Sequence, residues 1–365
     1  MSAEIDITEI ETAETDMTKT DIVKINFAEL IDRFPTASSF PKVKGDLRTF
    51  SSDFQVDEVL SFQPSGEGEH LFLQVKKIDS NTDWVARQLQ KKSGLTSRDI
   101  GYAGKKDRHS VSTQWFSLHL PGRQIELSEL QGEGYQIIAA IRHNKKLRRG
   151  SLLENKFEII IRNLTDSIDE VLIEKIKHTG VPNYFGKQRF GIGANNLIKA
   201  DELLKGKIKI KNRNKRGLII SSARSLLFNL QLAQRVAEKS WLTAVKGDCL
   251  MLAGTQSFFN VVDVSSQDSM RLQDGDLHIC GWLPGKQDSA ADYEAINKEQ
   301  TSLKNYSDWL EGLMGLNLDS ARRAFRCIPN HLKVEQHDGY VKFNFSLAKG
   351  CFATSVIREF VDATE

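Results

Sequence analysis

The chain has 365 residues, of which 40% are hydrophobic and 27% charged, and its formal net charge is +2. These values are ordinary for a soluble globular protein, and the length indicates two domains. No stretch approaches the roughly 18 consecutive apolar residues of a membrane helix, and no basic segment followed by an apolar run marks a secretory signal. The four cysteines are widely spaced, which argues against a zinc or thioredoxin-like motif. We therefore expect a cytoplasmic protein without membrane association, and a monomer as the default.

Charge is distributed unevenly along the chain. Residues 1–21 are rich in Glu, Asp and Thr, with Lys19 as their only basic side chain. Such a segment buries too little apolar surface to offset its ordering entropy, so we expect an acidic, disordered tail over residues 1–37. The remaining chain is more basic and has two clusters, at residues 142–149 and 205–216. A basic cluster alone is usually a solvated face, but clusters that flank glycine-rich aromatic segments favour a polyanion such as RNA.

In chain order, the predicted elements begin near residue 40 with a strand-rich half. Strands are expected at 50–59, 70–75, 100–104, 114–120, 135–142 and 157–162, with a helix after Asn81 and Thr82. After residue 182, helical periodicity appears at 195–204 and 221–239, followed by a strand-like stretch at 248–264, a loop at 282–285 and a helix-favouring stretch at 288–323. A strand returns at 341–345 before a closing helix at 352–360. This order indicates an insertion, after which the last strands rejoin the first sheet.

Several common catalytic motifs are missing from the sequence. Gly101-x-x-Gly104-Lys105 lacks the spacing of a phosphate-binding loop, and Gly191-x-Gly193 lacks the third glycine of a dinucleotide-binding turn. The chain also contains no His-Glu-x-x-His helix and no Gly-x-Ser-x-Gly elbow. The motifs therefore do not support a nucleotide cofactor, a zincin or an α/β-hydrolase.

Two segments remain as candidates for chemistry. In residues 101–114, Asp107 follows a glycine turn between Lys106 and the pair Arg108 and His109. A carboxylate among cations stays ionised, which suits a nucleophile or an electrostatic stabiliser, although a hydrophilic surface turn has the same composition. Residues 183–191 interleave aromatic side chains with cations between glycines. That pattern suits unpaired RNA bases, but it also suits a structural loop whose aromatics fill the core.

Taken together, these segments carry a resemblance to a known family. From about Asp53 to Glu359 the chain resembles the TruD family of tRNA pseudouridine synthases. The family's segment Gly-x-Lys-Asp-x-x-Ala-x-Thr-x-Gln is matched by Gly104, Lys106, Asp107 and Gln114. Ser110 and Ser112 replace the alanine and the threonine, and both are small. Residues 155–157, 183–191, 222–225 and 352–355 also resemble family segments.

The resemblance implies an α+β fold, with a mixed-sheet pseudouridine synthase catalytic core and an inserted α/β TRUD domain. The catalytic domain would comprise residues 38–179 and 327–365, and the inserted domain residues 180–326. The implied reaction isomerises uridine 13 in the D arm of tRNA to pseudouridine, without a metal or another cofactor. Asp107 would be the catalytic aspartate. It either attacks the substrate directly or removes a ribose proton to give a glycal-like intermediate, and the sequence leaves both routes open.

The resemblance also assigns a substrate pocket, because the target uridine must be flipped out of its stack. Phe54 and Phe352 would line this pocket, and Asn155 and Phe157 would contact the base. Judged without the resemblance, Phe54 is typical of a core residue and Asn155 of a turn residue. Four further residues are expected to support the site: Lys106, Glu58, Gln114 and Arg189.

Two other functions are compatible with RNA binding. A catalytically silent tRNA-binding protein could use the same scaffold to remodel tRNA. A methyltransferase or a nuclease is disfavoured, because the sequence contains neither a glycine-rich cofactor loop nor a cluster of Asp, Glu and His typical of metal binding.

Overall fold

The computed structural model describes residues 26–39 and 42–364. Its largest element is a ten-stranded mixed sheet with the order β14-β15-β7-β2-β5-β3-β6, to which β1, β4 and β16 are added. These strands are β1 (Val43–Leu47), β2 (Phe54–Leu60), β3 (His70–Ile78), β4 (Ile100–Tyr102), β5 (Val111–His119), β6 (Tyr135–His143), β7 (Leu152–Arg162), β14 (Asn330–His337), β15 (Tyr340–Ala348) and β16 (Val361–Thr364). Pairing is parallel between β2 and β5 and between β1 and β16, and antiparallel elsewhere.

Alternating apolar residues give this sheet its buried faces. In β3, Leu73 and Val75 point to one side and pack with Val85 and Leu89 of helix α2 (Thr82–Ser93). Because side chains alternate along a strand, Phe72, which precedes Leu73, points to the opposite side and belongs to a separate cluster. Helix α3 (Leu127–Leu130) covers the same face as Leu73 and Val75. Helices α4 (Glu170–Thr179) and α10 (Ala353–Ile357) cover the other half of the sheet.

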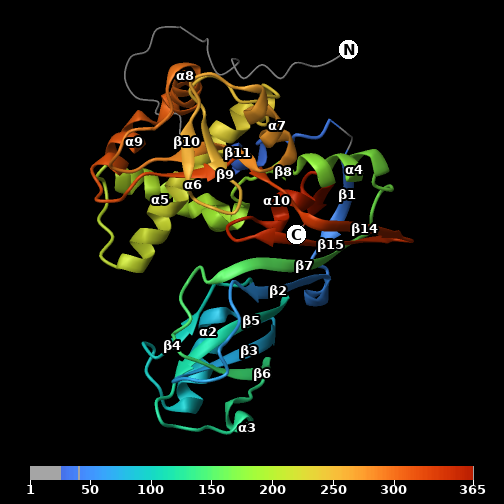
Figure 1. Cartoon of the computed structure of the whole chain (residues 1–365), viewed down its shortest axis with the longest axis vertical. Coiled ribbons are helices and arrows are strands. Elements are labelled where there is room, and N and C mark those ends of the chain that lie inside the picture. The colour runs from blue at the N-terminus through green and yellow to red at the C-terminus, as the bar shows by residue number, and fades with distance from the viewer. Residues whose placement is uncertain (1–25, 40–41, 365) are drawn as a thin grey trace.

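A second unit is built on an antiparallel four-stranded sheet with the order β10-β9-β11-β12. Its strands are β9 (Cys249–Leu252), β10 (Phe258–Asn260), β11 (Leu277–Leu283) and β12 (Ala321–Ala324), and its helices are α5 (Asn195–Leu204), α6 (Arg213–Ala237), α7 (Ser266–Asp274), α8 (Tyr293–Leu303) and α9 (Ser307–Met314). The long helix α6 buries Leu226, Leu227 and Phe228 in the centre of this unit. Figure 1 shows the unit beside β14 and β15, at the end of the long sheet opposite to β6.

The chain enters and leaves the second unit through two paired strands. β8 (Val181–Pro182) pairs with β13 (Arg326–Cys327) in an antiparallel arrangement. The mixed α+β fold predicted from the sequence is confirmed. It contains one mixed sheet and one antiparallel four-stranded sheet. We propose residues 180–326 as the inserted domain, with residues 38–179 and 327–365 as the catalytic domain.

The expectation of a disordered tail over residues 1–37 is wrong for residues 26–37. Helix α1 (Phe27–Asp32) buries Phe27 and Ile31 in the core of the second unit, and Phe34 stacks on Tyr184 with ring centroids 5.5 Å apart. Phe27, Ile31 and Phe34 follow one another at helical spacing. The expectation of disorder rested on the acidic composition of residues 1–21, a segment that does not contain them. Residues 1–25 lie outside the described part of the chain.

Other predicted elements differ in their bounds. Residues 282 and 283 belong to β11 and not to a loop, and the closing helix ends at Ile357 before β16 begins. Helix α4, which was not predicted, has an N-cap at Asp169, whose side chain accepts a hydrogen bond from the Val171 amide. Short 3-10 turns complete the chain: η1 (Ser51–Asp53), η2 (Lys187–Phe190), η3 (Ile192–Ala194) and η4 (Lys304–Tyr306). Within residues 26–39 and 42–364, no helix has both the length and the apolar character needed to span a membrane.

Candidate active site

Asp107 lies in the connection between β4 and β5, and two side chains hold its backbone carbonyl in place. The buried Lys77 of β3 donates a hydrogen bond from Nζ to the Asp107 carbonyl oxygen at 2.9 Å. Ser110 Oγ donates to the same oxygen at 2.9 Å. Burial lowers the pKa of Lys77 to about 8, and the negative charge of Asp107 opposes this shift. The turn is therefore attached to the sheet at the residue that carries the carboxylate.

The carboxylate of Asp107 takes part in a ring of three side chains. Arg48 donates from Nη2 to Oδ2 of Asp107 at 2.7 Å. In the amide orientation that satisfies both neighbours, Gln188 donates from Nε2 to Oδ1 of Asp107 at 3.0 Å and accepts from Nη1 of Arg48 at 3.1 Å. The Arg48 side chain is 10% exposed and that of Asp107 39% exposed. The carboxylate is thus oriented on one side and open to a substrate on the other.

The residues that precede Asp107 are held by a buried polar network. Lys106 forms an ion pair with Glu58 of β2, 2.6 Å between Nζ and Oε2, and both side chains are almost fully buried. Glu58 also accepts a hydrogen bond from the Trp115 amide at 3.2 Å. Truncating one partner of such a pair would leave an uncompensated buried charge. The pair thus joins residue 106 of the loop to β2.

Gln114 acts on the same loop through Thr82. The Thr82 hydroxyl donates to Oε1 of Gln114 at 2.8 Å and accepts from the Lys106 amide at 3.0 Å. Gln114 Nε2 in turn donates to the Gly104 carbonyl at 3.3 Å. Three predicted supporting residues, Lys106, Glu58 and Gln114, are therefore brought together around the backbone of residues 104–106.

An aromatic group lies next to the carboxylate. The Arg48 guanidinium stands 4.2 Å above the ring of Phe54, and so it connects this ring to Asp107. Phe54 meets Phe157 of β7 edge to face at 6.1 Å, and Phe157 stacks on Phe345 at 5.4 Å. Asn155 lies opposite Glu58 in the β2–β7 pairing, and its Oδ1 is buried without a hydrogen-bond partner.

Phe352 belongs to a second aromatic group. It packs against Phe185 at 5.7 Å, and the Arg323 guanidinium lies 4.1 Å from the Phe185 ring and 5.8 Å from the Phe352 ring. Desolvation lowers the pKa of Arg323 to about 10. The predicted supporting residue Arg189 joins this group, with its guanidinium 5.2 Å from the Phe185 ring. Residues 183–191 therefore touch Phe352 at one end and, through Gln188, Asp107 at the other.

Lys77, Gln188 and Arg48 are among the residues of this arrangement that were not predicted. Lys77 shares the strand face of Leu73 and Val75, so a lysine in phase with core positions was a usable signal. Gln188 lies inside a segment noted for its aromatics and cations, where a neutral amide draws no attention. Arg48 follows β1 with a left-handed backbone, φ 62°, and nothing in its sequence neighbourhood marks it.

The two basic clusters differ in what their side chains do. Arg142 donates to the carbonyl oxygens of Leu120 and Arg123, and Lys146 donates to that of Arg98. By contrast, the basic side chains of residues 205–216 are exposed: Lys205, Lys207, Lys209, Lys211, Arg213, Lys215 and Arg216. Lys205 pairs with Asp201 at 2.8 Å, and Lys145 and Arg148 of the first cluster are exposed as well. Both clusters therefore keep charges that are available to a partner, and the second keeps more of them.

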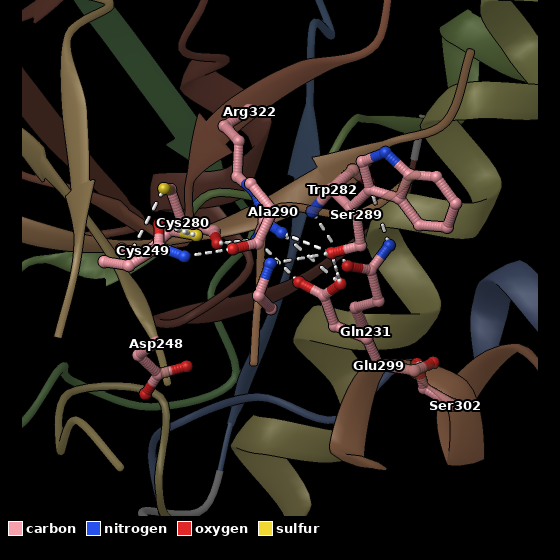
Figure 2. Close-up of polar contacts among 12 residues, drawn as sticks. Gln231, Asp248, Cys249, Cys280, Trp282, Ser289, Ala290, Glu299, Ser302 and Arg322 are labelled. Carbon is pink, nitrogen blue, oxygen red and sulfur yellow. Dashed lines mark hydrogen bonds and ion pairs between the residues drawn. The ribbon is translucent and has the colours of Figure 1, made fainter. Parts of the chain in front are cut away.

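A separate polar cluster lies inside the second unit, and Figure 2 shows its contacts. Arg322 pairs with Glu299 at 2.6 Å and also donates to the Cys280 carbonyl at 2.9 Å and to Ser289 Oγ at 2.5 Å. The adjoining cavity is about 10 Å³, room for one water molecule. Because its charges are paired with one another and it admits no substrate, this cluster is part of the core.

The chain is similar to proteins of one family over most of its length. The family described as tRNA pseudouridine synthase D (TruD) matches residues 31–210 and 194–360. A tRNA pseudouridine synthase D of Hydrogenovibrio crunogenus is 40% identical over 90% of this chain and 96% of the relative, and one of Pseudoalteromonas translucida is 39% identical over 89% and 92%.

A solved structure supports the fold independently. The structure from Methanosarcina mazei, described as a tRNA pseudouridine synthase D, superimposes with a TM-score of 0.69 at 19% identity and covers 91% of this chain and 97% of its own. At that identity the likeness concerns the fold alone. The sequence matches and the fold agree, and the chain belongs to the TruD family of tRNA pseudouridine synthases.

Proposed function

We propose that this chain isomerises uridine 13 in the D arm of tRNA to pseudouridine, with Asp107 as its catalytic carboxylate. The observation that carries the proposal is the ring of Arg48, Asp107 and Gln188, which orients the carboxylate while leaving 39% of the Asp107 side chain exposed. A carboxylate paired with a guanidinium is stabilised in its ionised form, as a nucleophile or a general base requires.

The reaction breaks the bond between N1 and C1′, turns the uracil over and joins its C5 to C1′ of the ribose. C5 then loses its proton and N1 gains one, so that the product is an isomer of the substrate. Asp107 serves either by attacking the substrate or by removing a ribose proton, and both routes begin with the ionised carboxylate. The chain itself supplies the groups for this proposal, and we propose no metal or other cofactor. Because the product is an isomer of the substrate, the exchange of the C1′–N1 bond for a C1′–C5 bond needs no oxidant or reductant.

The proposed pocket receives a flipped uridine. The half-buried rings of Phe157 and Phe352 offer stacking surface that recovers part of the cost of unstacking. Phe54 is 4% exposed and carries the Arg48 guanidinium on its ring, so it lines this pocket by supporting Arg48. The buried, unpartnered Oδ1 of Asn155 is an acceptor for the N3–H of uracil, because such an oxygen gains a full hydrogen bond when it meets a donor. The loops that carry these groups are held by four supporting residues: Lys106, Glu58, Gln114 and Arg189. We propose that tRNA is the partner and that a monomer is the active species.

Tritium release tests the proposal. tRNA that carries 5-tritiated uridine is incubated with the wild type, with Asp107→Asn and with Asp308→Asn, an exposed aspartate of α9. We expect release by the wild type and by Asp308→Asn, and a loss of roughly a thousandfold or more for Asp107→Asn. The modified position is then located in the wild-type product.

The alternative outcomes separate the competing functions. Equal release by Asp107→Asn and the wild type would remove Asp107 from the mechanism. Binding of tRNA without release from any tRNA would favour the catalytically silent tRNA-binding protein. Release from a position other than uridine 13 would retain the reaction and overturn the proposed target.

A further inference from the structure

Ile192 stands in solvent on the segment that carries Gln188. The residue is 98% exposed, the largest value among the exposed large hydrophobic residues of the described chain. Its neighbours in sequence behave differently, since Phe190 and Ala194 are buried in the core of the second unit. Burial of an aliphatic side chain is favourable, so this exposure is a cost that the free protein carries.

The backbone around Ile192 is strained in a way that presents this side chain. Gly191, Gly193 and Ala194 have φ values of 79°, 56° and 58°. The left-handed region is natural for the two glycines, but for Ala194 it is unfavourable because its Cβ crowds the carbonyl oxygen. Strain of this kind persists where the surrounding structure enforces it, and it is concentrated at functional positions.

The turn is rigid, because both of its ends are anchored. The Ala194 amide donates to the Gly191 carbonyl at 3.0 Å. The Arg189 carbonyl accepts hydrogen bonds from Ser222 Oγ at 2.7 Å and from Asn196 Nδ2 at 3.3 Å. Ile192 is therefore held at a defined position and does not belong to a loose loop.

This position is close to the candidate active site and to positive charge. Gln188, which contacts Asp107, precedes Ile192 by four residues, and four residues span at most about 14 Å. Lys187 has a side chain that is 77% exposed and pairs with Asp32 at 2.6 Å. The exposed basic residues 205–216 follow the far end of α5, the helix that begins beside the turn. An apolar tip at one end of α5 and exposed cations at its other end fit a partner that combines phosphates with flat apolar surfaces.

We propose that Ile192 is a wedge that enters the base stack of the tRNA and fills the gap left by the flipped uridine. The inference rests on the proposed function, because only a uridine that leaves its stack creates this gap. Insertion of an aliphatic side chain between bases is a general way to stabilise an unstacked nucleic acid. It would return Ile192 to an apolar environment and hold the uridine in the pocket at Asp107.

The experiment measures flipping and chemistry in the same tRNA. One substrate carries 2-aminopurine as the 3′ neighbour of the target uridine, so that loss of stacking raises its fluorescence. A second substrate has abasic nucleotides on both sides of the target, so that no stack holds the uridine. Single-turnover rates and tRNA affinity are compared for the wild type, Ile192→Ala, Ile192→Leu and Val171→Ala, a control at a 66% exposed aliphatic residue of α4.

We expect Ile192→Ala to lower the fluorescence change and the rate roughly tenfold on the stacked substrate, with a much smaller effect on the abasic one. Ile192→Leu should restore most of the loss, and Val171→Ala should match the wild type. A wild-type rate for Ile192→Ala, or an equal loss on both substrates, would overturn the wedge. So would a wild-type dimer that Ile192→Ala abolishes without a change in rate. A wild type that modifies neither substrate would instead refute the proposed function on which the wedge depends.

Discussion

Gln188 and Asp107 are 81 positions apart in sequence, and their side chains meet through a hydrogen bond of 3.0 Å. Gln188 belongs to η2, on the segment that leads into the second unit, whereas Asp107 lies in a turn of the long sheet. The carboxylate that we propose as catalytic is therefore oriented by two parts of the chain at once. Arg48 completes the arrangement, since it contacts both residues.

Replacement of Gln188 should change how the reaction depends on pH. Gln188→Glu keeps the shape of the side chain but places a second carboxylate beside Asp107. Because two neighbouring carboxylates resist joint ionisation, the acid limb of the single-turnover rate against pH should move to higher pH. Gln188 is exposed, so the fold should be unaffected. Lys187→Ala, at the adjacent exposed residue, is the control, and an identical profile for all three proteins would show that Gln188 has no part in orienting Asp107.

Lys77 should give the protein a pH-dependent stability. Its pKa is lowered by burial from 10.5 to about 8, so between these values the unfolded chain binds the proton more tightly than the folded chain does. The stability contributed at this position therefore rises as the pH increases from about 8 to 10.5. Lys77→Met removes the titration, and the free energy of unfolding of the wild type relative to this variant should increase over that interval. Urea unfolding at pH 7.5 and 9.5 measures it.

The neighbouring Lys76 provides the control for that measurement. It lies on the same strand with its side chain exposed on the opposite face. Lys76→Met should leave the pH dependence of unfolding as it is in the wild type. If Lys77→Met and Lys76→Met behave alike, the charge at residue 77 is not buried in solution.

Phe352→Ala should lower turnover while largely sparing tRNA affinity. The ring is half-buried against Phe185, and its removal takes stacking surface from a pocket that only the flipped base reaches. We expect a roughly tenfold lower single-turnover rate with less than about a threefold change in the dissociation constant. Phe258→Ala, at an exposed ring of β10, is the control. A large loss of affinity with an unchanged rate would place Phe352 in docking instead.

The exposed basic residues 205–216 should control the salt dependence of tRNA binding. Each lysine or arginine that meets a phosphate releases counterions and contributes about one unit to the slope of log affinity against log salt. Removing the charges of Lys211 and Arg213 should therefore flatten this slope by about two units. The same double change at Lys175 and Lys177 of α4 should leave it unchanged. If both double variants keep the wild-type slope, the basic residues are merely solvated.

Local sequence patterns predicted the elements that depend on local chemistry. The helix after Asn81 is present because the spacing of Val85 and Leu89 matches a helical face that packs on the sheet. Strands with buried alternate residues, such as β15, were predicted for the same reason. The two-residue β8 and β13 were not predicted, because such short strands exist only where another segment of chain pairs with them.

The site shows the same division. The segments around Asp107 and residues 183–191 were visible in the sequence, and the roles proposed for Phe54 and Asn155 rest on the family resemblance. Arg48 could not be found in this way, since its importance arises from contacts with Asp107, which is 59 positions away, and with Gln188 of a later segment. The fold brings these side chains together, and neither spacing nor composition encodes a contact of that separation.

The pairing of β1 with β16 has a consequence for how the protein is made. Val43 pairs with Val361 and Asp46 with Thr364, so strands from both ends of the described chain lie side by side in the sheet that carries Asp107. During synthesis on the ribosome, residues 43–47 emerge early and residues 361–364 emerge last, so β1 is made long before β16. The earlier strands must wait for the last ones with an open edge, and such long-range closure is slow. A chain that stops just before residue 361 would leave β1 without this neighbour. We expect chaperones to bind such a chain and proteases to degrade it before it becomes active.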